Sequence, residues 1–433
     1  MTHEKATYCS LLQPIGLFLA NGLVVGGWAT AIPIVGRKAG LSESLLSVVL
    51  LSFAVGGIVA MLLTPRAIQA LGTRTVSLAA GVGFLFLFPV VVGLSELSQL
   101  AIAAFFFGGC HGAMDVAMNA SAIETERLSG RRFMSKLHGC FSLGAAVGAG
   151  TFGLILNDQP AMVAFWYSAI IATAMVLIVI AAGAKDRTAG VQVAGQTEAA
   201  AGVSDTERQA EHRSAYPLSA VVSLGTIAFC CLVAEGAMVD WLVKLFQPGE
   251  GPTVETATTG SGFVYASFAI GMSVCRFAGD MISHSVGDRR TIIIGCLVSS
   301  VSLMLVLMTR NPVMAYVPAM FAGAGLANVI PSAFRACGKD VRRVGQTLAL
   351  VTTIGYAGFL FGPPVIGVIA DMSSLRIALF VPAASLAVAS VVAAMAEVLR
   401  APAIVTRAGA ADRSTDDAIR VKEENTLLQG EIL

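Results

Sequence analysis

The chain has 433 residues, of which 56% are hydrophobic and only 13% are charged. A soluble protein of this length would carry about 25% charged residues, so the composition excludes an ordinary water-soluble domain and predicts that most of the chain lies in lipid. The formal net charge is +1. Because there is also no basic cluster interleaved with aromatic residues, a nucleic-acid partner is not expected.

Long apolar spans recur from the N-terminus onwards. The first ten residues, MTHEKATYCS, hold one lysine and no cleavage site, so we expect the first span to be a retained helix rather than a signal peptide. A helix needs about 20 apolar residues to cross a bilayer core about 30 Å thick. The spans are apolar on all sides, which favours helices over alternating barrel strands. The predicted helices are 11–35, 43–63, 75–94, 99–121, 134–156, 161–183, 217–246, 258–282, 291–309, 312–335, 345–370 and 375–399.

Lysine and arginine orient these helices in the membrane. If the N-terminus is cytoplasmic, 17 of the 28 lysines and arginines fall in cytoplasmic loops and 5 fall in external segments. Cytoplasmic loops of membrane proteins carry such an excess. We therefore expect a multi-pass protein of the bacterial inner membrane, with both termini cytoplasmic and an even number of helices.

Two polar stretches divide the chain. Residues 184–215 and 400–433 have few large apolar side chains, and such segments cannot bury enough surface to fold alone. We expect a cytoplasmic linker and a flexible cytoplasmic tail, with six-helix bundles at 1–183 and 216–399. The predicted fold class is an all-α polytopic membrane protein with twelve transmembrane helices in two pseudo-symmetric bundles.

The two halves repeat weakly at an offset near 215 residues. The matching positions are Gly56, Gly72 and Arg74 with Gly271, Gly287 and Arg289, Trp28 with Trp241, and Gly112 and Asp115 with Gly325 and Asn328. Parallel repeats of this kind place a solute site between the halves, near the middle of the membrane.

One loop carries a family motif. The segment GMSVCRFAGDMISHSVGDRR, residues 271–290, resembles the loop between the second and third helices of a half in the major facilitator superfamily. In that family the glycine lets helices approach, the aspartate caps a helix, and the arginine pairs with acidic groups at the inner gate. The resemblance implies gate roles for Arg276, Asp280 and Arg289. The first-half copy, TPRAIQALGTRT, has Pro65 in place of the aspartate.

Three further segments carry a closer resemblance. HGAMDVAMNASAIETE at 111–126, MSKLHGCFSLGAAVGA at 134–149 and EGAMVDW at 235–241 resemble the MosC/YbjJ-like branch of the superfamily, which is similar to fucose-permease-type sugar symporters. MosC-type members are associated with rhizopine, an inositol amine. The resemblance implies a small hydroxylated solute.

Carboxylates at membrane depth are the candidates for proton coupling. An ionisable group there costs at least about 2.5–3.5 kcal/mol, which makes it a functional-site hypothesis. Asp115 shares one helix face with His111 and Asn119, each four residues away. The alternative is a buried hydrogen-bond network. Glu235 is the second candidate, with a structural salt bridge or a capped broken helix as its alternative. In general, burial disfavours an ionised carboxyl and a nearby cation favours it, so opening a cavity can release a proton.

Aromatic and amide side chains are the candidates for solute binding. Trp28 and Trp241 occupy matching places, and flat aromatic faces pack against sugar rings. The alternative places both in the interfacial aromatic belt. Amide side chains both donate and accept hydrogen bonds, which suits hydroxyl recognition. The predicted solute-binding residues are Asn21, Trp28, Asn119, Asp240, Trp241 and Asn328.

Charged residues near the ends of two helices form a candidate gate. Glu124 and Glu126 end the fourth predicted helix, and His138 begins the fifth, with Lys136 and Arg131 between them. Ion pairs among them would close the cytoplasmic side and break on opening. The alternative is ordinary interfacial charge at helix ends.

Enzyme motifs are missing from the sequence. There is no phosphate-binding loop, zinc-protease motif or nucleophile elbow, and most cysteines fall inside apolar spans as packing residues, so we expect no enzyme, cofactor or metal. We expect a monomeric secondary transporter in the lipid bilayer that symports a small sugar-, polyol- or inositol-like solute with protons. The alternative is a proton-driven efflux antiporter of drug-like or toxic molecules, which an aromatic content of 7% disfavours.

Overall fold

The computed structural model describes residues 3–130, 133–156, 159–181, 218–247, 254–337 and 344–400, and every regular element within these ranges is a helix. Eleven helical segments of this described part are long and apolar enough to cross a membrane. The predicted span that is not among them corresponds to α10, which nevertheless lies inside the molecule against α5 and α13.

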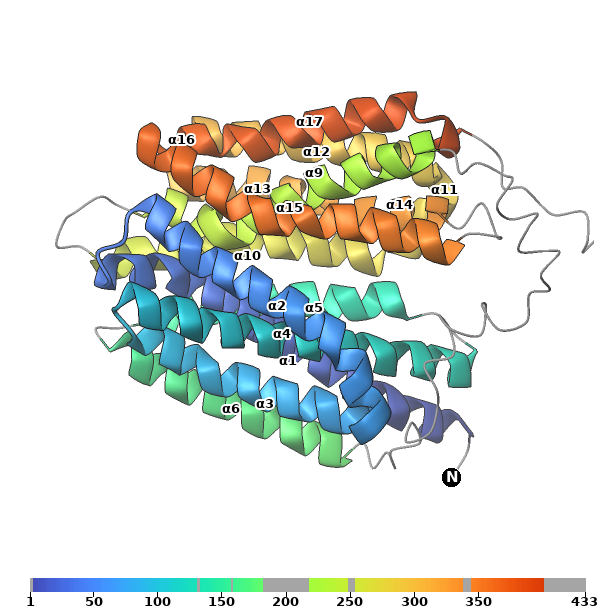
Figure 1. The fold of residues 1–433 in the computed structure, drawn as a ribbon, viewed down its shortest axis with the longest axis horizontal. Coiled ribbons are helices and arrows are strands. Elements are labelled where there is room, and N and C mark those ends of the chain that lie inside the picture. Colours follow the sequence, from blue (N-terminus) through green and yellow to red (C-terminus); the bar gives the residue numbers. More distant parts are fainter. Residues whose placement is uncertain are drawn as a thin grey trace, which may run out of the picture.

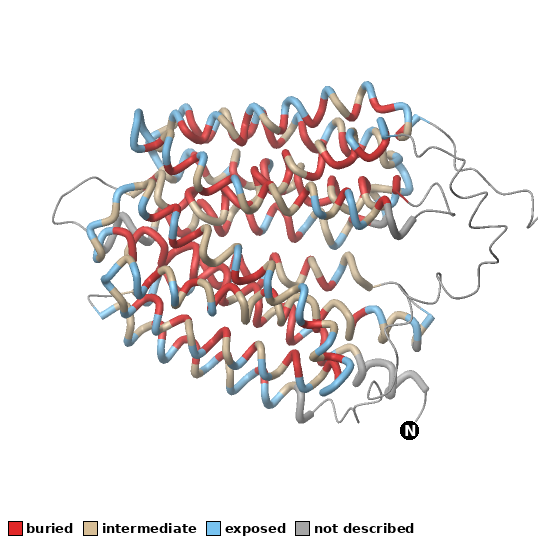
Figure 2. Tube along the Cα trace, viewed as in Figure 1, coloured by how far each residue is buried: buried red, intermediate tan, exposed pale blue. Residues whose placement is uncertain are grey.

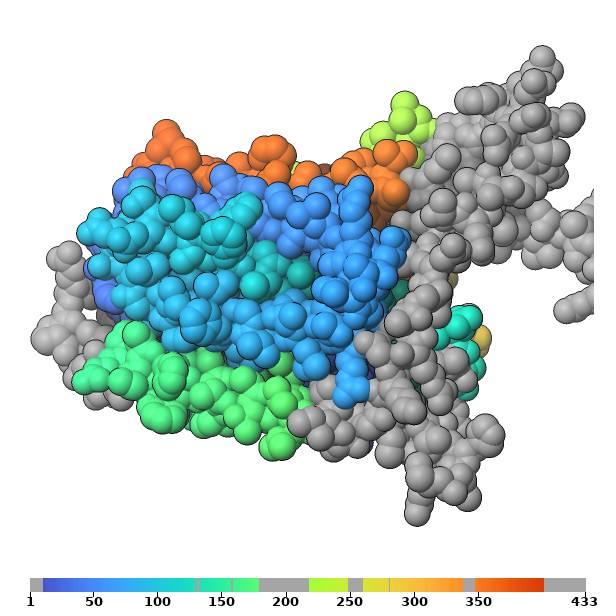
Figure 3. Space-filling model, turned by 60° about the horizontal axis from the view of Figure 1, so that its bottom comes forward, coloured from blue at the N-terminus to red at the C-terminus, as the bar shows by residue number. Residues whose placement is uncertain are grey.

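The first bundle occupies the lower half of Figure 1, coloured blue to green. Its helices are α1 (His3–Lys38), α2 (Glu43–Leu71), α3 (Thr73–Gly93), α4 (Leu97–Ser129), α5 (Met134–Ile155) and α6 (Pro160–Ala181). The predicted second helix ended at residue 63, but α2 continues through Pro65 for two more turns. Proline is tolerated in membrane helices because neighbouring groups satisfy the backbone that it frees. Figure 3 shows one face of this bundle, over which α2, α3 and α6 form a continuous surface.

The second bundle occupies the upper half of Figure 1. Its helices are α9 (Leu218–Leu245), α10 (Val254–Phe277), α11 (Gly279–Val286), α12 (Asp288–Met308), α13 (Pro312–Leu326), α14 (Val329–Cys337), α15 (Val344–Met372), α16 (Leu375–Ala378) and α17 (Phe380–Met395), followed by a 3-10 turn at Glu397–Leu399. Three of the spans predicted as single helices are therefore divided.

The break between α13 and α14 has a clear cause. Pro331 has no N–H to donate to the carbonyl of Ala327, so the helical hydrogen bond is missing at that point. Residues 327 and 328 form a turn, and Asn328 stands in the interruption. The break places a polar side chain beside Cys275, near the end of α10.

Two glycines of the sequence repeat adopt the same unusual backbone. Gly72, between α2 and α3, has φ 81° and ψ 153°, and Gly287, between α11 and α12, has φ 80° and ψ 151°. Such φ values favour glycine because a side chain would clash with the backbone. The matched glycines thus make the same turn in both halves.

A second matched pair lets helices pack closely. A side chain at Gly56 on α2 would overlap the carbonyl oxygen of Phe105 on α4, and one at Gly271 on α10 would overlap that of Met320 on α13. Small residues at such crossings allow the backbones of membrane helices to approach. The repeat therefore preserves the crossing points of the scaffold.

Burial separates the inside of the molecule from a lipid-like surface. Buried residues gather on the helix faces that point inwards in both bundles (Figure 2). Large apolar side chains such as Leu62, Phe86 and Ile170 are about seven-tenths exposed on the outside. Between the bundles, α5 packs against α10 and α2 packs against α15. A surface of this kind matches hydrocarbon rather than water.

Candidate functional site

A cavity of about 720 Å³ lies between the two bundles. Side chains of α1, α2, α4 and α5 line one wall, and those of α9, α10, α14 and α15 line the other. The lining reaches Glu126 and Arg335 at the end of the molecule where α1 begins, here called the N-terminal end, which is on the right in Figure 1. A volume of this size suits a small molecule.

The first bundle contributes a carboxylate to this cavity. Asp115 and His111 both line it, in agreement with the prediction that they share one face of their helix. The Nδ2 of Asn119 donates to the Oδ1 of Asp115 at 3.2 Å and to its main-chain oxygen at 2.8 Å. Asn119 itself is not among the lining residues, and its amide holds the Asp115 carboxylate. The His111 ring lies 5.2 Å from that of Phe84.

The second bundle contributes an ion pair. Arg276 of α10 places its Nη2 3.3 Å from the Oε1 of Glu235 on α9, and both residues line the cavity. Its Nη1 donates to the Oγ of Ser142 on α5 at 2.7 Å, and its main-chain oxygen accepts from Ser135 at 2.6 Å. Arg276 was predicted to belong to the gate, but it lies beside the predicted proton site. The salt bridge considered as an alternative for Glu235 is present, inside the cavity.

A third carboxylate, Asp240 of α9, also lines the cavity. Among the described residues, no hydrogen bond or ion pair holds it. Trp28 lines the same cavity, is 2% exposed and packs 5.4 Å from Phe107. Asn328 lines it as well, and its Nδ2 donates to the main-chain oxygen of Cys275 at 2.9 Å. These three predicted solute-binding residues share one space.

Two other predicted solute-binding residues are absent from the described lining. Asn21 is wholly buried against Met118, with its Nδ2 3.7 Å from the sulfur, and Met118 takes its place at the wall. Trp241 is also wholly buried, because it follows Asp240 and points about 100° away around α9. Trp28 and Trp241 are 2% and 0% exposed, so neither belongs to the outer surface of the molecule, and their role in solute binding stays a prediction.

The predicted gate residues are dispersed. Glu124 pairs with Arg127 of its own helix at 3.0 Å, so it makes no link to the second bundle. Glu126 lines the cavity and accepts from the N–H of Met134 at 2.8 Å, which caps the start of α5. His138 lines the cavity and packs edge-on against Phe18.

Two further gate candidates belong to the second bundle. Arg289 donates from Nη2 to the main-chain oxygen of Ala394 at 2.7 Å. The side chain of Asp280 lies outside the described residues. In this structure, Arg289 and Glu124 each bond within their own bundle. The predicted ion pairs are ones that break when the gate opens, and the cavity reaches this end, so a gate role for these residues stays a prediction.

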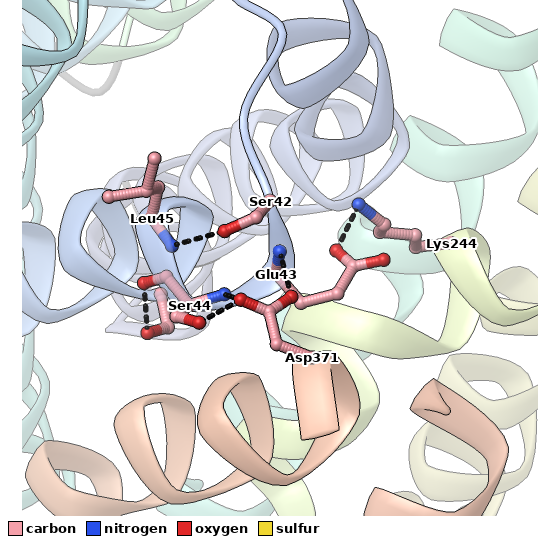
Figure 4. A network of polar contacts seen from close by, with 7 residues as sticks. Ser42, Glu43, Ser44, Leu45, Lys244 and Asp371 are labelled. Carbon is pink, nitrogen blue, oxygen red and sulfur yellow. Dashed lines mark hydrogen bonds and ion pairs between the residues drawn. The ribbon is translucent and has the colours of Figure 1, made fainter. Parts of the chain in front are cut away.

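The opposite end of the cavity is closed. The lining stops at Leu50 on α2 and at Pro363 on α15, about two helical turns short of the helix ends. Beyond it, Lys244 of α9 pairs with Glu43 of α2, and Asp371 of α15 accepts hydrogen bonds from the start of α2 (Figure 4). The sequence analysis did not predict these contacts. Opposite charges at helix ends on the same side of the membrane could have indicated an ion pair between the bundles.

Comparison with known proteins decides the family. The model of the Major Facilitator Superfamily matches residues 16–260 and 251–423. The chain belongs to this superfamily. An uncharacterized MFS-type transporter of Yersinia pestis is 32% identical over 382 residues, covering 87% of this chain and 94% of that protein. The membrane protein MosC of Rhizobium meliloti is 30% identical over 380 residues, covering 86% of each. The predicted likeness to the MosC-type branch of the major facilitators is confirmed.

Solved structures of other major facilitators have the same fold. The nucleoside transporter NupG aligns with a TM-score of 0.67 at 12% identity, covering 89% of this chain and 98% of that one. A D-xylose-proton symporter aligns with a TM-score of 0.65 at 14% identity, covering 90% and 97%. The predicted fold class is thereby confirmed, and the chain is a membrane transporter of small molecules.

Proposed function

We propose that this major facilitator is a proton-coupled symporter of a small, polar, hydroxylated solute such as a sugar, polyol or inositol. The observation that carries the proposal is that one cavity between the bundles holds Asp115 from the first bundle and the Glu235–Arg276 pair from the second. Asp115 and Glu235 are the proposed proton carriers, with His111 beside Asp115.

The surroundings of the carboxylates support proton coupling. A buried charge without a partner is costly, and a proton removes that cost. Asp115 has a neutral amide as its hydrogen-bond donor, and Glu235 has a cation. A proton on Glu235 would release Arg276, which also holds Ser142 of the first bundle. Protonation would thereby alter a contact between the two bundles.

The polar groups in the cavity support a hydroxylated solute. Asn328, Tyr265 and Asp240 offer hydrogen bonds, and Trp28 offers an aromatic face. The named solutes of the two structural neighbours, nucleosides and D-xylose, carry several hydroxyl groups. Resemblance to the MosC-type branch points in the same direction.

The proposal includes a place in the cell. The distribution of lysine and arginine favours the bacterial inner membrane with both termini cytoplasmic, a linker at 184–215 and a tail at 400–433. With this orientation, the cavity reaches toward the cytoplasm and the end closed by Lys244, Glu43 and Asp371 faces outward. We propose a monomer, because one chain supplies both walls of the cavity.

Uptake into proteoliposomes tests the symport. A panel of sugars, polyols, inositols and nucleosides is offered with and without an inward proton gradient. Accumulation above equilibrium that needs the gradient is the expected result. Glu96→Gln is a matched control, because Glu96 is an exposed carboxylate at the start of α4 and makes no side-chain cap. Uptake of every active solute that ignores the gradient would refute the proposal.

A second function is favoured by one observation. Eight of the described lining residues are aromatic: Trp28, Phe53, Phe141, Tyr265, Phe268, Phe334, Tyr356 and Phe359. Together with the acidic groups, they suit a proton-driven efflux antiporter of drug-like compounds. A toxicity screen of a deletion strain separates the two functions, since loss of an efflux pump sensitises cells and loss of a nutrient symporter does not.

A further inference from the structure

A carboxylate of the second bundle caps a helix of the first. Asp371, at the end of α15, accepts from the N–H of Glu43 at 2.8 Å and from the N–H of Ser44 at 3.1 Å, and the Ser44 hydroxyl also donates to it. Figure 4 shows the carboxylate facing the first turn of α2. Ser42 bonds the N–H of Leu45 from its own chain segment. The cap that crosses between the bundles is thus additional to a local one.

An ion pair joins the same two bundles beside this cap. Lys244, in the last turn of α9, pairs with the carboxylate of Glu43, and their side chains are 16% and 26% exposed. Glu43 therefore takes part in both contacts, through its N–H and through its side chain. At the same place α15 lies close to α2, because a side chain at Gly367 would collide with Ser47.

The helix cap and the ion pair both stabilise the closed state of this end, and both must break when it opens. The start of a helix carries unpaired N–H groups and a partial positive charge, which a carboxylate stabilises. On α2 and α15 the cavity lining ends about two turns below them, at Leu50 and Pro363, and on α9 it ends about one turn below Lys244, at Asp240. Solute can enter or leave at this end only if α2 moves away from α9 and α15, which separates Asp371 from α2 and Lys244 from Glu43.

We propose that Asp371, Glu43 and Lys244 form the gate at this end of the transporter, and that the strength of their contacts sets how often the gate opens. The cap on α2 is its central part, so Asp371 is a positioning residue for the transport cycle. The gate follows from the two-bundle fold alone and needs neither a particular solute nor proton coupling.

Thiol labelling measures the gate directly. A cysteine is placed at Val239, which lines the cavity, and a membrane-impermeant maleimide is applied in separate experiments to each face of the membrane. The parent protein without Val239→Cys gives the background from native cysteines, none of which is among the described lining residues. Asp371→Ala should raise the labelling rate from the gated face roughly 2- to 30-fold, the population change that loss of a helix cap produces.

Charge exchange separates gating from misfolding. Lys244→Glu should raise labelling from the gated face, and combining it with Glu43→Lys should restore the slow rate. Glu96→Ala removes an exposed carboxylate at the same end of the molecule, outside the gate, and should change nothing. Thermal melting of each purified variant shows whether it is folded. The gate is refuted if folded Asp371→Ala and Lys244→Glu proteins label as slowly as the parent, or if Glu96→Ala speeds labelling equally.

Discussion

The two bundles share a scaffold and differ in the chemistry that they bring to the cavity. At the offset of 215 residues, Arg276 of the second bundle corresponds to Met61 of the first, and both line the cavity. At the offset of 213 that relates the two tryptophans, Glu235 corresponds to Gly22, where a side chain would overlap the carbonyl oxygen of Phe141. The ion pair therefore has no counterpart at these positions of the first bundle.

The first bundle carries a different polar group instead. Asp115 is bonded by the neutral Asn119, whereas its repeat partner Asn328 donates to a main-chain oxygen. The comparison teaches that the repeat preserves how helices approach, while the polar groups facing the cavity have diverged. Because the two carboxylates have such different partners, they should differ in how readily they bind or release a proton when the cavity opens.

The largest expected effect is a loss of stability on substituting the glycines at the helix crossings that both bundles share. Gly108 on α4 and Gly323 on α13 abut the backbones of Phe53 and Phe268, again 215 residues apart. Gly108→Ala and Gly323→Ala should each destabilise the protein by about 1–3 kcal/mol or more, because the added methyl group overlaps backbone. Thermal melting in detergent measures the loss. Gly93→Ala, where a side chain meets only ordinary contact, is the control. A loss confined to one bundle would break the comparison.

The next largest loss of stability is expected when Arg276 of the second bundle is replaced by methionine, the residue at the matching position of the first. Arg276→Met leaves Glu235 without its cation. Loss of one partner of a buried pair costs about 3–5 kcal/mol, but these side chains are 13% and 20% exposed in a cavity, so about 1–2 kcal/mol of folding free energy is expected. Adding Glu235→Gln should recover most of the melting temperature. A single variant as stable as the parent would show that the pair is unimportant.

The two tryptophans give the smallest effect. Trp28→Phe should raise KM for the solute roughly 2- to 10-fold, because a stacked aromatic contact is worth about 0.5–1.5 kcal/mol. Trp241→Phe should leave KM unchanged, because that side chain is buried away from the cavity lining. Initial uptake rates over a range of solute concentrations provide both values. Equal changes in KM would mean that both residues influence the site indirectly.

Much of the fold was readable from the sequence because lipid imposes long apolar spans. The breaks inside those spans were harder to predict. Pro65 does not end α2, which continues to Leu71, whereas α13 ends at Leu326, five residues before Pro331. The same residue type thus has opposite outcomes, so a proline alone does not fix where a membrane helix ends.

The site was predictable in part for a related reason. Asp115, His111 and Glu235 stood out because ionisable groups in lipid need a wet or paired place. Depth along a helix does not fix the direction around it, so Trp241 was placed in the site when only its neighbour Asp240 faces the cavity. Contacts between distant segments, such as Asp371 with the start of α2, depend on how the bundles meet and leave little trace in the local sequence.

The central claim is that Asp115 and Glu235, in one cavity, couple proton movement to solute movement. Measuring the proton movement that a solute gradient drives tests this claim most directly. Purified protein is placed in proteoliposomes containing a pH-sensitive dye, and a solute gradient is applied without an imposed proton gradient. The account predicts that inward solute flow acidifies the lumen, and that Asp115→Asn abolishes this signal while solute counterflow continues. Proton movement of normal size in the Asp115→Asn protein would contradict it.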